Sequence, residues 1–565
     1  MPRFLKLVLP TLAVTFSALL LAEEPASDLP SLTIRTSSRM VVVDVVASDK
    51  KGKPVTGLKA DEFTVEENGK KQKIGVFSPA SARKLQGNAP STGILSNRAE
   101  SVGPAGAPVV LLIDALNTHF REQAYGRSEM LKYVAEQAQT GRPMAVLALT
   151  DRLHVLQQFT SDPQVLLSAI RQFKPQESVL QPGTALPPPT LAVQNELASF
   201  SNVQLSYQSE RRTIITLEAM RALARMLGGL PGRKSVVWLT ADLPFALIPE
   251  DREISNEQLL ADLPGQGRQR SLAVNAGGSM AAEQRQLHND DIRQAESRLA
   301  SANISIYPVD LRGLVSGAES LSEISGAHPE DIHGADLANA ALAQASSLRS
   351  SQATLEEIAA ETGGKAYINE NEIKQGVALA AADDEAAYTI GYYPENKKWD
   401  GKYRNIRLKT SQGDLQLRYR RGYFALDPLA SKQTNHDGDV LSAVEFNAPA
   451  TQISFLAQAK PADAGKVRVV FLVDAHTIAA EDAGSSKKLD VNFYAFAFDS
   501  MGKSLGVHSL KVDRAFDAAT FQQIMDKGMM VPLDMDLPAG TNELRLAILD
   551  NKTGYIGTAR GPLQQ

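Results

Sequence analysis

An acidic side chain stands at the end of an apolar run in the segment VVLLIDALNTHFREQ, residues 109–123. The run Val109–Ile113 is typical of a buried strand, because every position is apolar. Asp114 follows directly, a polar turn comes next, and the chain becomes helical from Glu122. A carboxylate in this position predicts a metal or ligand site at the carboxyl edge of an α/β sheet. The alternative is that Asp114 only hydrogen-bonds the turn that follows it.

A second group of polar residues that could do chemistry lies in the segment GAHPEDIHGAD, where His328 and His333 stand near several carboxylates. Such a group could support a hydrolase that uses these histidine-bearing loops or a metal-activated water. Pro329 and Gly334 instead favour a polar loop, and the spacing matches no known zinc motif.

Other catalytic signatures are missing from the sequence. It has no Gly-x-Ser-x-Gly elbow, no phosphate-binding Walker loop and no dinucleotide-binding glycine pattern. The segment NHDGD at 435–439 has calcium-like oxygens but lacks the glutamate that completes an EF-hand loop, so it is expected to be a solvated linker. We therefore expect a protein that is not an enzyme.

The elements around Asp114 alternate between strands and helices. Apolar segments that predict buried strands recur along the chain: Val109–Ile113, Met144–Leu149, Ser235–Leu239, Ile304–Val309 and Ala366–Ile368. Amphipathic helical segments lie between them, and one begins at Asp162-Pro163, an N-cap followed by a first-turn proline. This alternation predicts an α/β domain with a mainly parallel sheet covered by helices on both faces.

All-β patterns flank this central part of the chain. Alternating residues with tight turns predict a small N-terminal β module, a β appendage after the α/β domain, and a C-terminal region resembling a β-sandwich. The predicted boundaries are 31–79 for the N-terminal module, 80–107 for a linker, 108–385 for the α/β domain with insertions at 175–212, 250–283 and 315–350, 386–425 for the appendage, 426–439 for a second linker, and 440–565 for the C-terminal domain.

The N-terminus indicates export from the cytoplasm. Arg3 and Lys6 precede a short apolar run that ends at Ala22, so residues 1–22 are expected to be a signal peptide cleaved after Ala22. We expect the protein in the periplasm, on the cell surface or in the medium, with no transmembrane segment after cleavage. The chain has no cysteine, which excludes disulfides, and its net charge of −5 gives no reason to expect nucleic acid as a partner.

The order of these segments resembles a known family. An apolar strand ending in IDALNT, followed by GRKSVVWLT and ISIYPVDLRGL, is similar to the von Willebrand factor type A (VWA) domain. Together with the early VVVDVVASDKKGKPVTGL and the late YTIGYYPENKKWDGKYRNIRLK, it resembles an exported VWA-related family of the acidobacterial type over about residues 32–425. The resemblance implies a Rossmann-like VWA fold.

The same resemblance implies a metal-ion-dependent adhesion site built from three loops, in which oxygen ligands hold Mg²⁺ or another divalent cation. The first aspartate of the family motif falls on Asp114 and its second serine on Thr118, with Asn117 as an additional oxygen. The second loop supplies Thr213, and the third supplies Asp242, one residue later than in the family. Leu116 and Ala241 replace ligands, so the motif is degenerate, and a fold that persists without the metal is an equal alternative.

These observations predict an exported binding or adhesion protein. It would recognise a protein or a cell-envelope ligand through the carboxyl edge of the VWA domain. If a divalent ion is bound at this edge, it would bridge to an acidic group of the partner. The alternatives are a metal-free structural scaffold of an envelope assembly and, less favoured, the hydrolase that would use His328 or His333.

Overall fold

A computed structural model describes most of the chain after the first 39 residues. The described residues are 40–79, 93–102, 108–136, 142–180, 191–245, 291–312, 334–368, 378, 380, 382–383, 386–427, 436–462 and 465–563. The predicted signal peptide, the predicted insertion 250–283 and both His328 and His333 lie outside them.

A five-stranded sheet forms the centre of the α/β domain. Its order is β10-β9-β6-β7-β8, and all neighbouring strands are parallel except the edge strand β8. The strands are β6 Val109–Asp114, β7 Met144–Leu149, β8 Leu153–Thr160, β9 Lys234–Thr240 and β10 Ile304–Asp310. The expectation of a mainly parallel sheet is confirmed, whereas the predicted strand Ala366–Ile368 contributes a single bridge from Tyr367 to Val309.

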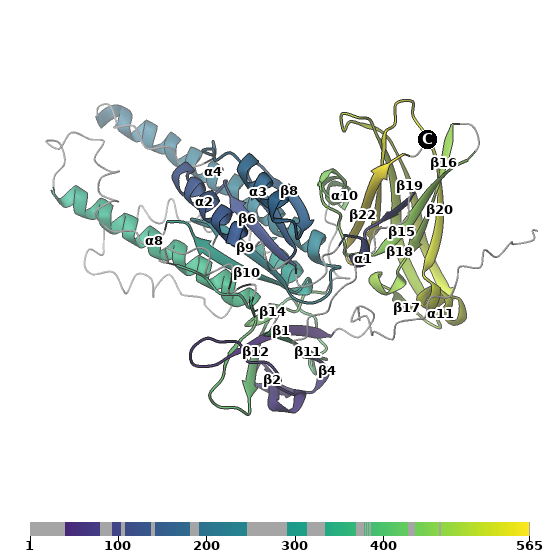
Figure 1. Ribbon diagram of the computed structural model, residues 1–565, viewed down its shortest axis with the longest axis horizontal. Helices are drawn as coiled ribbons and strands as arrows, with labels where there is room; N and C mark the ends of the chain where they lie inside the picture. Colours follow the sequence, from purple (N-terminus) through teal and green to yellow (C-terminus); the bar gives the residue numbers. More distant parts are fainter. Residues whose placement is uncertain are drawn as a thin grey trace, which may run out of the picture.

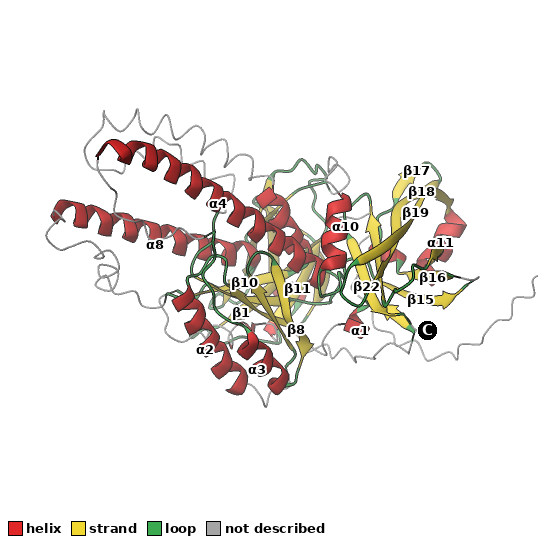
Figure 2. Ribbon diagram, turned by 90° about the horizontal axis from the view of Figure 1, so that it is seen from above, coloured by secondary structure: helices red, strands yellow, loops and turns green. Residues whose placement is uncertain are grey.

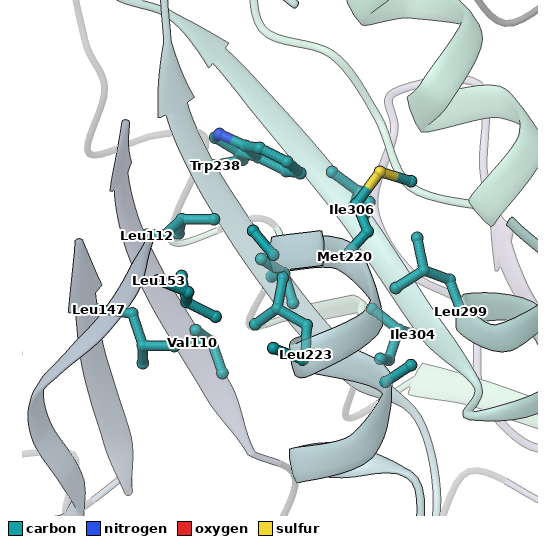
Figure 3. Close-up of a cluster of buried hydrophobic side chains, with 14 of the residues drawn as sticks. Val110, Leu112, Leu147, Leu153, Met220, Leu223, Trp238, Leu299, Ile304 and Ile306 are labelled. Carbon is teal, nitrogen blue, oxygen red and sulfur yellow. The ribbon is translucent and has the colours of Figure 1, made fainter. Parts of the chain in front are cut away.

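Helices cover both faces of this sheet (Figure 1). One face packs against α2 Phe120–Glu136 and α3 Pro163–Gln172, the other against α4 Leu191–Leu227, the helical residues 291–301 and α8 Gly334–Thr362. Asp162 caps α3 as predicted, accepting hydrogen bonds from the backbone N–H groups of Gln164 and Val165. Figure 3 shows the core on the α4 side, where Met220 and Leu223 of α4 lie against side chains of the sheet such as Trp238.

Two long helices extend beyond the sheet on the same side (Figures 1 and 2). Helix α4 has 37 residues and α8 has 29. Both precede segments that enter the amino side of the sheet, so their N-terminal halves lie toward its carboxyl edge. The predicted insertions 175–212 and 315–350 therefore contain helix in their described parts. No helix in the described part of the chain has the length and apolar character needed to cross a membrane.

Segments on either side of the α/β domain combine into one β unit, which we call the N-terminal β unit. One sheet has the order β13-β1-β11-β4 and the other β14-β12-β2-β3. The first part of the chain supplies β1 Val41–Ser48, the 3-10 helix Ala60–Glu62, β2 Phe63–Glu67, β3 Lys70–Gln72 and β4 Ile74–Ser78. The predicted appendage supplies β11 Ala387–Tyr392, β12 Tyr403–Thr410, β13 Gln416–Arg418 and β14 Gly422–Phe424.

Buried polar side chains join the two contributions. Tyr392 and Tyr423 donate hydrogen bonds to Oε2 of Glu67 over 2.9 and 2.8 Å, and Arg404 lies 3.3 Å from Oε1 of the same carboxylate. Arg404 and Glu67 are 1% and 4% exposed, so each depends on the other for its charge partner. The early strand β2 is therefore tied to three later elements of the chain.

The C-terminal domain is a sandwich of two antiparallel sheets, with orders β20-β16-β15-β5 and β17-β18-β21-β22 and with β19 paired to β18. Side chains of both sheets, including Phe471 and Phe493, share one core. Its elements are α10 His436–Glu445, β15 Phe455–Pro461, β16 Lys466–Val473, the 3-10 helix Ala475–Thr477, β17 Glu481–Ala483, β18 Ser486–Phe498, β19 Ser504–Asp517, α11 Ala518–Lys527, β20 Met529–Asp536, β21 Glu543–Asp550 and β22 Ile556–Pro562.

The predicted linker 80–107 contributes to this sandwich. It includes strand β5, Ile94–Ser96, which pairs with β15, and helix α1, Ala99–Val102. Asn97 is 1% exposed and anchors the segment. Its Nδ2 donates to the carbonyls of Ala450 and Ile453, both over 2.7 Å, and its Oδ1 accepts from the N–H of Phe455 over 2.9 Å.

Replacing Asn97 by alanine is expected to destabilise the C-terminal sandwich by about 3 kcal/mol, because the carbonyl of Ile453 and the N–H of Phe455 lose their side-chain partner, while the carbonyl of Ala450 keeps only the N–H of Thr558. Urea unfolding followed by circular dichroism, with hydrogen exchange of β15 as a local readout, would measure the loss. The exposed Asn396→Ala is the matched control. Equal midpoints for the two variants would contradict this role of Asn97.

A carboxylate between the α/β domain and the N-terminal β unit makes stability depend on pH. Burial, followed by the charges of Glu361 and Glu357, raises the pKa of Glu296 from 4.5 to about 8, while Arg293 opposes the rise. A raised carboxyl pKa stabilises the fold most below about 4.5, and this contribution is lost as the pH rises toward about 8.

Glu296→Gln is therefore expected to melt at a higher temperature than the unchanged protein at pH values above about 8, with a difference that shrinks toward pH 5. Melting curves across this range would test it, with the exposed Glu100→Gln as control. A difference that does not change with pH would contradict the assignment.

Candidate functional site at the carboxyl edge

Asp114 ends β6 and is completely buried at the carboxyl edge of the central sheet. Its Oδ1 accepts hydrogen bonds from the backbone N–H groups of Leu116 and Asn117, over 3.1 and 2.8 Å. Its Oδ2 lies 3.0 Å from each of three donors, which are Nδ2 of Asn117, Nε1 of Trp238 and Oγ1 of Thr240. Five groups of the protein itself therefore surround this carboxyl group.

Burial raises the pKa of Asp114, while hydrogen bonds from Asn117, Trp238 and Thr240 oppose the rise. Thr240 Oγ1 also lies 2.7 Å from the carbonyl of Asp242. Thr240 therefore connects the carboxyl group of Asp114 to the loop at Asp242.

The other predicted ligands lie around Asp114 and hold the neighbouring loops. Thr118 Oγ1 accepts a hydrogen bond from the N–H of Ala241 over 3.0 Å. Asp242 Oδ1 accepts from Ser351 of helix α8 over 2.7 Å. The structure therefore brings the Asp114 loop and the Asp242 loop together, as the sequence predicts.

Thr213 is the predicted ligand that contacts the edge least directly. On α4, its hydroxyl group contacts the carbonyl of Ser209 over 2.9 Å and that of Pro244 over 3.2 Å. It therefore touches the loop after Asp242. Thr216, one turn further along α4, lies 3.1 Å from Nδ2 of Asn117 and connects the helix to the Asp114 loop.

Arg212 is a neighbour of the site that sequence reasoning did not identify. Burial lowers the pKa of its guanidinium, and the negative charges of Asp242 and Asp114 oppose that decrease. An arginine therefore supplies positive charge beside both aspartates, where the family motif would imply a divalent cation. In the sequence, Arg212 directly precedes Thr213, which is one of the predicted metal ligands. A basic residue next to a predicted ligand was the signal that could have identified it.

The donor set fits a divalent ion poorly. Both oxygens of Asp114 already accept hydrogen bonds, and the buried oxygen without a hydrogen-bond partner in this loop is Oδ1 of Asn117, a neutral ligand. The described residues contain no cluster of three or more histidine or carboxylate side chains that could hold a metal. Binding of Mg²⁺ stays a prediction from the motif.

Hydrogen bonds from buried and neighbouring side chains hold the loop after Asp114 in place, and the apolar Phe120 at the end of this loop is exposed. Gln123 is fully buried, and its Nε2 donates to the carbonyl of Thr118 over 2.7 Å. Phe120, at the start of α2, is 53% exposed, and its N–H binds Oε2 of Glu177 over 3.0 Å. The same carboxylate contacts His119 over 2.7 Å.

The exposed apolar side chains form what we call the apolar rim, which consists of Phe120, Val179, Tyr207 and Ile214. Val179 and Tyr207 are 89% and 58% exposed. The carbonyl of Val179 accepts from Gln208, the residue after Tyr207, and Glu177 joins the same loop to Phe120. Ile214 lies seven residues after Tyr207, two turns along the same face of α4. Three segments thus expose apolar surface beside the Asp114 loop.

Asp114→Asn is expected to lower the free energy of unfolding by about 3 kcal/mol, because either orientation of the amide turns an NH₂ group toward hydrogen-bond donors. Urea unfolding followed by tryptophan fluorescence would report the change, since Trp238 contacts the carboxyl group. The exposed Asp61→Asn serves as control. An unfolding curve that matches the unchanged protein would contradict this structural role.

Comparison with known proteins gives distant structural similarity. No protein-family model matches the sequence, and no curated protein matches it. An aerotolerance-related membrane protein from Bacteroides fragilis is similar at 12% identity and a TM-score of 0.24, covering 50% of this chain and 100% of that one. BatB from Bacteroides thetaiotaomicron gives 10% identity and a TM-score of 0.22, covering 50% and 98%.

A von Willebrand factor type A protein from Catenulispora acidiphila is similar at 8% identity and a TM-score of 0.20, covering 89% of this chain and 74% of that one. The chain is therefore distantly similar in structure to VWA-domain proteins. At these TM-scores the similarity carries no information about function.

Proposed function

We propose that this chain is an exported, non-enzymatic binding protein that recognises a protein partner through the carboxyl edge of its α/β domain without a metal ion. The observation that carries the proposal is the enclosed Asp114, whose two oxygens accept five hydrogen bonds from the protein, beside an edge that exposes apolar side chains.

Metal independence follows from competition for the same oxygens. A divalent ion at Asp114 would have to displace donors such as Trp238 and Asn117 and leave them without partners in a buried place. It would also meet the positive charge of Arg212, which interacts with both Asp114 and Asp242. The carboxyl group instead acts as the internal support of the loop that leads to Phe120.

The apolar rim supplies the contact surface. Aromatic side chains contribute large apolar area at a small conformational cost and are enriched among the dominant contacts of protein interfaces. Phe120 and Tyr207 are each more than half exposed, on segments that hydrogen bonds and helix packing hold in place. A partner with an apolar surface would bury these side chains on a largely preformed edge.

Export rests on residues 1–22, which have the pattern of a signal peptide, and the lack of cysteine suits a bacterial envelope better than a disulfide-rich exterior. One specific observation favours the alternative function as a scaffold. The N-terminal β unit and the C-terminal sandwich each combine strands from distant parts of the chain. A scaffold would bind its assembly through other surfaces, so the apolar rim discriminates between the two functions.

The test is capture of partners from an envelope fraction by the purified protein carrying a photo-crosslinking residue at position 211, which is exposed on α4. Phe120→Ser or Tyr207→Ser is expected to reduce capture about thirtyfold, since truncating a dominant interface aromatic costs about 2 kcal/mol. The matched control is Met501→Ser, which removes an apolar side chain that is 87% exposed on the C-terminal sandwich.

Addition of EDTA should leave capture unchanged, and calorimetric titration with Mg²⁺ or Mn²⁺ should give no binding heat. Capture that disappears with EDTA would restore the metal-dependent function. Capture that survives both rim substitutions would favour the scaffold.

A further inference from the structure

A cavity of about 480 Å³ lies where the C-terminal end of α8 meets the N-terminal β unit. Figure 1 shows this end of α8 beside β14. The cavity is lined by α8 and the turn after it on one side, and by β12, β13, Tyr419 and Arg421 on the other. It is therefore separate from the carboxyl edge, which contacts α8 nearer its middle, at Ser351.

The walls of this cavity are set by backbone contacts. Gly363 has a φ of +76°, and a Cβ atom there would lie 2.8 Å from the backbone nitrogen of Arg420. A Cβ atom at Gly364 would lie 1.9 Å from the carbonyl oxygen of Ile306. Gly363 therefore lets the N-terminal β unit approach the end of α8 closely, and Gly364 does the same for strand β10 of the central sheet. These contacts hold the elements around the cavity in place, and ligand sites are usually preformed in this way.

The cavity is lined by both apolar and cationic side chains. Ala360 and Leu417 are among the apolar residues, while Lys365, Arg418 and Arg421 are cationic. Lys365 is exposed and lies 5.0 Å from the ring of Tyr367, with no carboxylate partner among the described residues. Its charge is therefore available to a ligand.

The two arginines keep part of their donor capacity. Arg421 meets Glu357 only at 3.5 Å, which is longer than a good charge-assisted hydrogen bond. Arg418 pairs with Asp383, yet its buried Nε has no hydrogen-bond partner among the described residues. Against these three cations, the lining contains one carboxylate, that of the exposed Glu356.

We propose that this cavity binds a small amphipathic organic anion, with its carboxylate at Lys365 and Arg421 and its apolar part against Ala360 and Leu417. The volume lies within the range of about 300–1,000 Å³ typical of small-molecule sites. The cationic groups select the sign of the ligand charge, and the apolar wall selects a ligand with a hydrocarbon body. The site is independent of the partner-binding edge.

Calorimetric titration of the full chain with octanoate tests the proposal, with acetate and octylammonium as comparison ligands. Octanoate is expected to bind, whereas acetate lacks the apolar part and octylammonium has the wrong charge. Lys365→Gln and Arg421→Gln should each weaken octanoate about tenfold, as expected for loss of a charge-assisted hydrogen bond. Glu356→Gln should strengthen it, because a like charge is removed.

Ala360→Phe fills the cavity and should abolish octanoate binding, while Lys51→Gln, an exposed lysine on the β unit, should leave it unchanged. Circular dichroism of each variant verifies folding. The proposal is overturned if octanoate does not bind, if octylammonium binds equally well, or if binding is insensitive to the Lys365, Arg421 and Ala360 substitutions.

Discussion

A carboxyl group without access to water organises the centre of this molecule. Asp114 is expensive to bury, and it is tolerated because strand β9, through Trp238 and Thr240, and the loop after β6, through Asn117, all direct donors to it. Asn117 extends the set to Thr216 on α4. Two strands, a loop and a helix thus share one group of buried polar contacts, and the geometry of the carboxyl edge depends on it.

The apolar segments of the α/β domain could be predicted from sequence because burial on both faces leaves a local pattern. Every residue of Val109–Ile113 is apolar, and Ile304–Val309 contains a single polar residue, Ser305. The pairing of β1 with β11, which aligns Val41 with Tyr392, could not be predicted, since local periodicity says nothing about partners so far apart in the chain. For the same reason Ile94–Ser96, a short segment in polar surroundings, reads as linker and not as a strand of the distant sandwich.

The residues of the candidate site also fall into two groups, those that could be predicted from the sequence and those that could not. The closeness of Asp114 to Thr118 and Asp242 could be expected, because the carboxyl ends of adjacent parallel strands meet at one edge. The contribution of Trp238 could not, because it points a ring nitrogen of an otherwise apolar core residue at Asp114. Arg212 likewise acts from a helix about a hundred residues further along the chain.

The pairing of β1 with β11 also constrains the order in which the molecule can form. During synthesis from the N-terminus, β1 remains without its neighbours β11 and β13 until more than three hundred further residues have been made. Closing so long a loop is slow relative to helix formation, and an unpaired apolar strand is prone to aggregate meanwhile. We therefore expect the α/β domain, which lies in the chain between the two halves of the N-terminal β unit, to fold before that unit and to bring its two halves together.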